Sequence, residues 1–340
     1  MEEQEEYLPL LPPENNAMVM PEEATNPPSF HMQTRVNYWS QFGLLLALIG
    51  AGVVAASIAS IIVVKTMMPH VSLFSLDKAL LDPANAYAMK VLQLVSTVLM
   101  FFMPAFLFGL IAYKKPFTYL GFNINISWKQ VGLVVLIAWM ALFVGSALGD
   151  LNERIPIPKH WQEKFKKAEN EYNEQVFAIA KMNNTKEYLL VVLIIALIPA
   201  IVEETFFRGM MQRFFVDWFG NPWVAIVLTS VIFSGIHMSY YGFLARAMLG
   251  VVLGLLYYYG KSIWLNIMAH FLNNAVAVTA LYTYSLKGKL TKDALEDHFP
   301  LWLCLIGTVT LVALLINFKK KSETFLAEKE TLKLQNEFYR

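Results

Sequence analysis

Three groups of polar side chains interrupt hydrophobic stretches in the second half of the chain, and their types are those that activate water. The first group is Glu203, Glu204 and Arg208, and the other two contain His237 and His270. A charged side chain near the centre of a bilayer costs about 2.5–3.5 kcal/mol on insertion scales, so such residues are rare without a partner or a function. Two carboxylates and two imidazoles together predict a water-activating site within a membrane.

The first group lies in the segment LIPAIVEETFFRG, which ends at Gly209. On a helix, Glu204 and Arg208 project within about 40 degrees of each other, an i,i+4 spacing that forms ion pairs. Glu203 points elsewhere, so one carboxylate is neutralised and the other is free to face a cavity. Pro199 lacks a backbone donor and can loosen the helix one turn earlier. The alternative is a cluster of charges at a helix end near the membrane surface.

The other two groups place imidazoles and amides on later apolar segments. Phe233 precedes His237 by four residues, so we expect its ring to pack beside the imidazole. Asn266, His270 and Asn274 recur at i,i+4 spacings and form one polar stripe, which should face the interior of a helix bundle. Taken singly, these residues fit a hydrogen-bonded core histidine and amides that join neighbouring helices equally well.

Together, the three groups favour a hydrolase. A carboxylate and an imidazole can hold and deprotonate a water, while a second imidazole and an amide can donate hydrogen bonds to the oxyanion of a peptide carbonyl. Glu203, His237 and His270 could also hold a divalent metal such as Zn²⁺, because imidazoles and a carboxylate are zinc ligands. The spacing does not decide between metal-activated and carboxylate-activated water.

The pattern EExxxR, then FxxxH, then HxxxN, on separate late transmembrane helices, resembles the CPBP family. That family groups the type II CAAX prenyl endopeptidases with bacteriocin-processing and bacteriocin-immunity (Abi) proteins. The resemblance covers roughly residues 187–285, within which EETFFRG is especially close to the first family motif. By this resemblance, Glu203 would be the general base, and Glu204 would support it through Arg208. His237 would hold the water or metal, and His270 with Asn274 would form the oxyanion site.

Other intramembrane proteases fit poorly. None of the six histidines lies in an HExxH motif, which argues against zinc proteases of the site-two type. The triplet at 233–235 lacks the first glycine of a rhomboid-like GxSG, and the triplet at 148–150 lacks that of a presenilin-like GxGD. Serine and aspartyl mechanisms are therefore not indicated.

The elements that carry these residues are predicted to be membrane spans. Of the 340 residues, 56% are hydrophobic and only 16% are charged, far from the averages of soluble proteins. A span needs about 20 largely apolar residues. Eight segments qualify: 40–64, 89–113, 129–149, 187–209, 222–238, 243–259, 262–284 and 299–318. The fold class is therefore all-α, a polytopic transmembrane helix bundle with about eight spans.

Composition divides the chain into five parts. These are a disordered acidic tail at 1–35, three spans at 36–150, a polar surface loop at 151–186, the catalytic core with spans four to seven at 187–285, and the last span with a cytoplasmic tail at 286–340. The net charge of +1 offers no basic surface for nucleic acid, so the expected partners are the lipid bilayer and a peptide or protein substrate at the membrane.

The orientation follows from the basic residues after the last span. Lys319, Lys320 and Lys321 favour a cytoplasmic C-terminus in a cell membrane, and an even number of spans puts both termini on that side. Lys287 and Lys289, in the preceding link, oppose this orientation.

Two functions from other classes compete with a peptidase. A non-catalytic immunity or scaffold protein could have the same fold, because fold does not determine function. A transporter or channel could use the intramembrane carboxylates and histidines as a proton relay. The protease pattern favours an intramembrane endopeptidase over both, acting on a membrane-associated, prenylated or bacteriocin-like peptide.

Overall fold

The computed structural model describes residues 34–72, 76–79, 82–180, 182–288 and 301–338, and the elements in these residues are all helices. The acidic tail predicted at 1–35 lies almost wholly outside them. Within them, seven helices are long and apolar enough to cross a membrane, and α11 (Pro222–Gly235) is a shorter apolar helix. The chain is therefore a multi-pass integral membrane protein built as an all-α bundle, as the sequence predicts.

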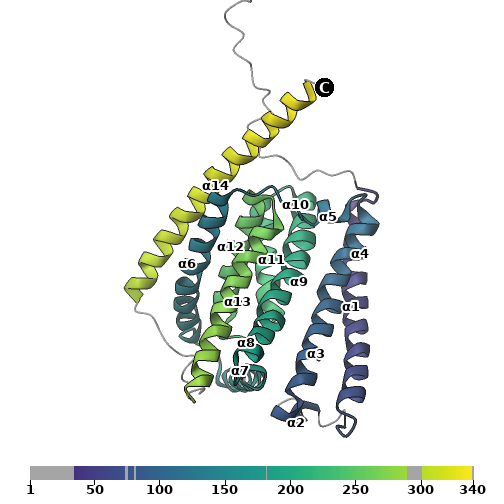
Figure 1. Cartoon of the computed structure of the whole chain (residues 1–340), viewed down its shortest axis with the longest axis vertical. Coiled ribbons are helices and arrows are strands. Elements are labelled where there is room, and N and C mark those ends of the chain that lie inside the picture. Colours follow the sequence, from purple (N-terminus) through teal and green to yellow (C-terminus); the bar gives the residue numbers. More distant parts are fainter. Residues whose placement is uncertain (1–33, 73–75, 80–81, 181, 289–300, 339–340) are drawn as a thin grey trace, which may run out of the picture. The chain divides into compact units, whose positions relative to one another are not determined.

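The elements can be followed along the chain in Figure 1. The first half contains α1 (Tyr38–Met67), α2 (Leu76–Ala79), the 3-10 turn η3 (Pro83–Asn85), α3 (Ala86–Thr97), the π-helical η4 (Val98–Phe102), α4 (Met103–Ala112), α5 (Pro116–Tyr119), α6 (Trp128–Glu153) and α7 (Lys159–Ala180). The second half contains α8 (Thr185–Val191), the π-helical η5 (Val192–Leu197), α9 (Ile198–Glu204), the π-helical η6 (Thr205–Gln212), α10 (Arg213–Phe219), α11, α12 (Phe243–Gly260), α13 (Ile263–Leu286) and α14 (Leu301–Phe338).

The helices pack in two groups with the run from α8 to α10 between them (Figure 1). In one group, α1 packs against α3, η4 and α4; in the other, α6 packs against α12, α13 and α14. The run from α8 to α10 contacts both groups, through α9 with η4 and through η5 and α9 with α13. Because α11 also packs along α12, the polar segments of the second half are brought together inside the bundle.

The fourth span is longer than the sequence predicts. Residues 185–219 form one continuous helical run, so only Gly220 and Asn221 link it to α11, rather than the whole segment between the predicted spans 187–209 and 222–238. Gly220 ends the run in the left-handed conformation with φ +66°, which glycine adopts without steric cost. Asn221 then caps α11 by accepting from the backbone N–H of Trp223 at 2.9 Å.

Two stretches of the fourth span have π-helical geometry. The first, η5, directly precedes the turn that contains Pro199, whose missing N–H removes a helical hydrogen bond. The second, η6, begins directly after Glu204. Such wide turns occur mostly as local bulges and often at functional sites.

The link at 151–186 contains the 22-residue surface helix α7, which lies at the lower end of the helices in Figure 1. Phe165 of α7 stacks on Tyr240 with ring centroids 4.8 Å apart and an interplanar angle of 4°. The Ser239 hydroxyl donates to the Glu169 carboxylate at 2.6 Å. One side of α7 is therefore attached to the short link between α11 and α12.

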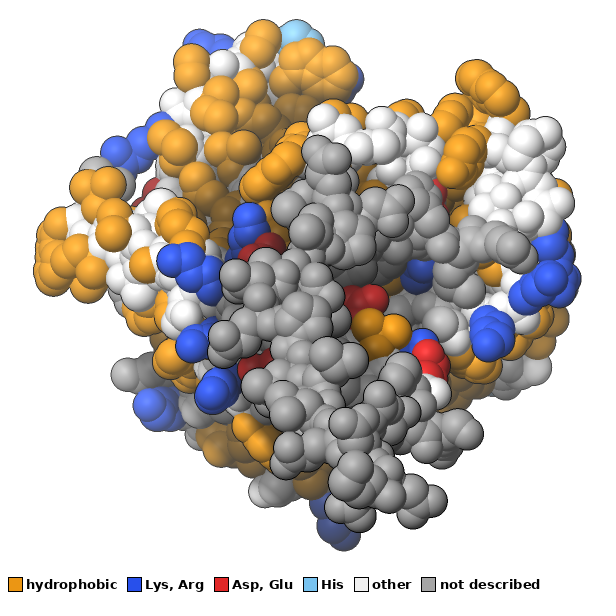
Figure 2. Space-filling model, turned by 90° about the horizontal axis from the view of Figure 1, so that it is seen from above, with side chains coloured by type: hydrophobic (Ala, Val, Ile, Leu, Met, Phe, Trp, Pro, Cys, Tyr) orange, Lys and Arg blue, Asp and Glu red, His pale blue; other side chains and the backbone are white. Residues whose placement is uncertain are grey.

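Basic residues gather at the opposite end of the bundle. This end holds α5, α10 and the link between α12 and α13 (Figure 1), and Figure 2 shows Lys and Arg side chains on it. Its cations include Lys114 and Lys115 after α4, and Lys261 after α12.

Candidate active site

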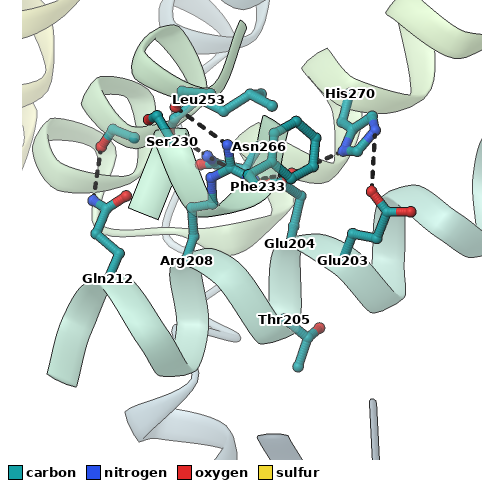
Figure 3. Close-up of polar contacts among 12 residues, drawn as sticks. Glu203, Glu204, Thr205, Arg208, Gln212, Ser230, Phe233, Leu253, Asn266 and His270 are labelled. Atoms are coloured by element: carbon teal, nitrogen blue, oxygen red, sulfur yellow. Dashed lines mark hydrogen bonds and ion pairs between the residues drawn. The ribbon is translucent and has the colours of Figure 1, made fainter. Parts of the chain in front are cut away.

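Glu204 and Arg208 form a fully buried ion pair (Figure 3). Glu204 ends α9, Arg208 lies in η6, and both side chains are 0% exposed. Arg208 donates through Nη1 to Glu204 at 2.9 Å and through Nη2 to the backbone oxygen of Gly250 at 3.2 Å. Its guanidinium also lies 4.8 Å from the ring centroid of Phe233, at cation–π distance. The predicted i,i+4 pair is thus present, and its charges are satisfied within the bundle.

Arg208 can reach the backbone oxygen of Gly250 because α12 packs closely against α11 at this position. A Cβ atom added at Gly250 would lie 2.8 Å from the Ser230 Cβ of α11, closer than real Cβ contacts come. The absence of a side chain at this position therefore lets the two helices meet and brings the Gly250 carbonyl to Arg208.

His270 connects the two glutamates. Its side chain, on α13, is 4% exposed, and its Nδ1 lies 2.8 Å from Oε1 of Glu204. An ionised carboxylate only accepts hydrogen bonds, so Nδ1 carries the proton and donates it to Glu204. The other ring nitrogen, Nε2, lies 3.9 Å from Oε2 of Glu203. The buried glutamate therefore fixes the tautomer and the direction of an imidazole that faces the second glutamate.

Asn266 completes the surroundings of Glu204. Its Nδ2 donates to Oε2 of Glu204 at 3.4 Å and to the backbone oxygen of Leu253 (Figure 3). Each oxygen of the Glu204 carboxylate thus has a donor. Sequence reasoning placed Asn266 on the polar stripe but not in the site, although its i,i+4 spacing from His270 was the signal that could have included it.

Glu203 differs from its neighbour in exposure. Its side chain is 15% exposed, and its contact with His270 is its one ion pair among the described residues. Adjacent residues on a helix project about 100 degrees apart, so the two glutamates cannot share one environment. Glu203 is therefore the carboxylate that water and a substrate can reach.

His237 lies in the link after α11, where its Nδ1 is 2.7 Å from the backbone oxygen of Phe233. A carbonyl accepts, so Nδ1 is the protonated nitrogen and Nε2 keeps its lone pair. Burial lowers the pKa of His237 to about 4; the hydrogen bond to Phe233 opposes this, and the charges of Arg246 and His270 add to it. The imidazole is therefore neutral at pH 7 and can accept a hydrogen bond through Nε2.

The Phe233 ring lies between the two histidines, with its centroid 5.0 Å from that of His237 and 6.0 Å from that of His270. The predicted packing of Phe233 beside His237 is therefore present. Asn274 stands one turn after His270 on α13, is half-buried, and accepts from Asn273 at 3.4 Å. The arrangement brings Glu203, Glu204, Arg208 and His270 into one chain of contacts, with His237 beside it and Asn274 outside it.

The suggested metal ligands do not form a metal centre. Within the described residues, no three His, Cys, Asp or Glu side chains lie close enough together to hold a metal ion. Glu203 lies 3.9 Å from Nε2 of His270, but His237 does not join them in a group of three possible ligands. We therefore derive no step through zinc.

Residues 185–276 match the family model described as type II CAAX prenyl endopeptidase, Rce1-like. This part of the chain is therefore similar to the CAAX proteases. The matched residues run from the start of α8 into α13, so the CAAX-protease domain contains all six side chains predicted for the site. No curated protein and no solved structure matches the chain. The family is one of proteases, which supports a peptidase in this part of the chain.

Proposed function

We propose that the protein is an intramembrane endopeptidase in which Glu203 activates water. One observation carries this proposal: Glu203 is the less buried of two adjacent glutamates and faces Nε2 of a histidine that the other glutamate holds. A base must be within reach of water, whereas the carboxylate that orients its neighbour must not change its contacts.

The charges of the cluster support this role for Glu203. Two carboxylates and one guanidinium give the side chains of Glu203, Glu204 and Arg208 a net charge of −1. When Glu203 takes a proton from water, one negative charge passes from its carboxylate to the hydroxide, so a site of low dielectric constant gains no net charge in this step. The hydroxide attacks the peptide carbonyl, and the carbon–nitrogen bond then breaks. The proton on Glu203 passes to the leaving amine, which leaves the enzyme unchanged.

The remaining roles rest on the family resemblance and on the surroundings of each side chain. His237 would hold the attacking water through the lone pair on Nε2. His270 and Asn274 would donate to the oxyanion, His270 through Nε2 when the ring carries a second proton. Asn274 would have to turn toward His270 to do so.

We propose a membrane-bound peptide as the substrate, with an S-prenylated peptide as the first to test. The protein, reconstituted in liposomes, would be given internally quenched peptides with and without an S-farnesyl cysteine. We expect Glu203→Gln to abolish cleavage, because an amide cannot take the proton from water. Glu171→Gln, the same change on the exposed face of α7, is the matched control and should cleave at the wild-type rate.

Two results would contradict the proposal. Cleavage by Glu203→Gln at the wild-type rate would exclude Glu203 as the base. Absence of cleavage by the wild type, together with protection or partner binding that survives the same substitution, would favour the immunity or scaffold function.

A further inference from the structure

Arg246 is a second arginine near the site, and its surroundings differ from those of Arg208. It lies in the first turn of α12, directly after the link that carries His237. Its Nη2 donates to the backbone oxygen of Ser239 at 2.8 Å, whereas its buried Nε has no hydrogen-bond partner. Among the described residues, no carboxylate lies within ion-pair distance of its guanidinium. Arg246 is therefore a partly buried cation with unused N–H donors.

The positive charge of Arg246 acts on the site. It contributes to the lowered pKa of His237, after the effect of burial. Partial burial raises the pKa of the Tyr172 phenol on α7, and the charge of Arg246 lowers it. The Tyr172 pKa is also raised by Glu203. The geometry agrees, because Arg246 contacts the backbone oxygen of Ser239, two residues after His237, and Ser239 in turn contacts Glu169 of α7. Arg246 therefore lies where α7 meets the link that carries His237.

Arg208, the other arginine described beside the site, is not available to an anion. Arg208 is fully buried, and its charge is already paired with Glu204; its Nε also lacks a partner, but no solvent or substrate can reach it. Glu169 of α7 accepts a hydrogen bond from the Ser239 hydroxyl at 2.6 Å, so this carboxylate already has a partner other than Arg246. A planar guanidinium with free donors matches a carboxylate in a two-point contact, and such charge-assisted bonds are about twice as strong as neutral ones.

We propose that Arg246 binds a carboxylate group of the peptide substrate and so selects peptides that carry one close to the bond that is cut. This inference rests on the proposed peptidase function. The carboxylate could be the α-carboxylate at the end of the peptide or the side chain of an acidic residue. Both have the same chemistry, and peptide design separates them. A charged hydrogen bond corresponds to a preference of about 10- to 150-fold.

The experiment compares three forms of one quenched peptide in liposomes of phosphatidylcholine alone, so that no anionic lipid competes. The peptide ends in a carboxylate, in a carboxamide, or in a carboxamide after a terminal glutamate. We expect the wild type to show a kcat/KM about 10- to 150-fold higher for a carboxylate form than for the plain carboxamide. In Arg246→Gln this ratio should fall to about 1, since the amide can still donate to Ser239 but carries no charge.

Two further variants separate charge from geometry and from surface effects. Arg246→Lys keeps the charge but loses the planar fork, so its ratio should be intermediate. Lys167→Gln removes an exposed cation from α7 and should leave the wild-type ratio. Equal kcat/KM values for all three peptides in the wild type, or a preference that persists in Arg246→Gln, would overturn the proposal.

Failure of the peptidase function can be told apart from failure of this inference. If the wild type cleaves none of the peptides, the peptidase function is wrong, and binding of the same fluorescent peptides to the liposome-embedded protein tests Arg246 alone. Tighter binding of a carboxylate form by the wild type, lost in Arg246→Gln, would support the anion site. Equal binding of all forms would refute it.

Discussion

The buried pair of Glu204 and Arg208 predicts strong coupling between two substitutions. Both side chains are 0% exposed and 2.9 Å apart, so removing either charge leaves the other buried without its partner. We expect Glu204→Gln and Arg208→Met each to lower the free energy of unfolding by about 3–5 kcal/mol. The double variant leaves no unpaired charge and should be more stable than the sum of the single effects predicts, by about 1–3 kcal/mol.

The assay is unfolding of the purified protein by titration of mixed micelles with sodium dodecyl sulfate, followed by fluorescence of its eight tryptophans. The four proteins of the cycle are measured under one condition, and the coupling is the difference between the double effect and the sum of the single ones. Additive effects, or single effects below about 1 kcal/mol, would refute a buried pair with this geometry.

Activity should separate the two members of the pair. In Glu204→Gln, His270 loses the carboxylate that holds its Nδ1 proton, and the analogous change at a serine-protease triad lowers kcat about 10⁴-fold. In Arg208→Met, the contact between Glu204 and His270 is retained, so the loss of activity measured while the protein is folded should be smaller. Equal losses would mean that Glu204 does not act by positioning His270.

Two other predictions test the packing and the protonation of the site. Gly250→Ala should lower the unfolding temperature in detergent, because the new Cβ would meet α11 at 2.8 Å, whereas the control Gly132→Ala, with nothing within 4 Å, should not. His237 should titrate near pH 4 in an NMR titration rather than near its usual 6.5. Between these two values the unfolded chain binds more protons at this residue than the folded one, so acidification should reduce stability over that range. A midpoint near 6.5 would contradict the burial of the imidazole.

Local spacing was sufficient to predict contacts between residues four positions apart. The pair of Glu204 and Arg208 follows from four-residue spacing, and so does the packing of Phe233 beside His237. Contacts between helices depend on how α9, α12 and α13 pack, which periodicity does not specify. The sequence therefore placed Asn266 and His270 on one stripe without revealing that both donate to Glu204.

The ends of the elements were predicted less well where the polar composition was misleading. The fourth span was predicted to end at residue 209 and the fifth to begin at 222, but the helical run of the fourth span continues through Phe219. The polar link at 151–186 was expected to be a partly helical surface loop, and it contains the 22-residue helix α7, on which Phe165 stacks on Tyr240. In α10, Phe214 and Phe215 are buried in the core, so tertiary packing extends the helix beyond the apolar stretch.

The adjacency of the two glutamates explains how one short motif can serve two chemical purposes. Neighbouring positions on a helix diverge by about 100 degrees, so the second acid turns into the packed interface of α12 and α13, while the first remains partly accessible. The interior carboxylate is held by a guanidinium, an imidazole and an amide, and such a group cannot exchange protons without losing those contacts. The accessible carboxylate has a single imidazole as its partner. Proton transfer at Glu203 therefore leaves intact the contacts that position His270, which lets the base change its charge during a turnover while the geometry of the site stays fixed.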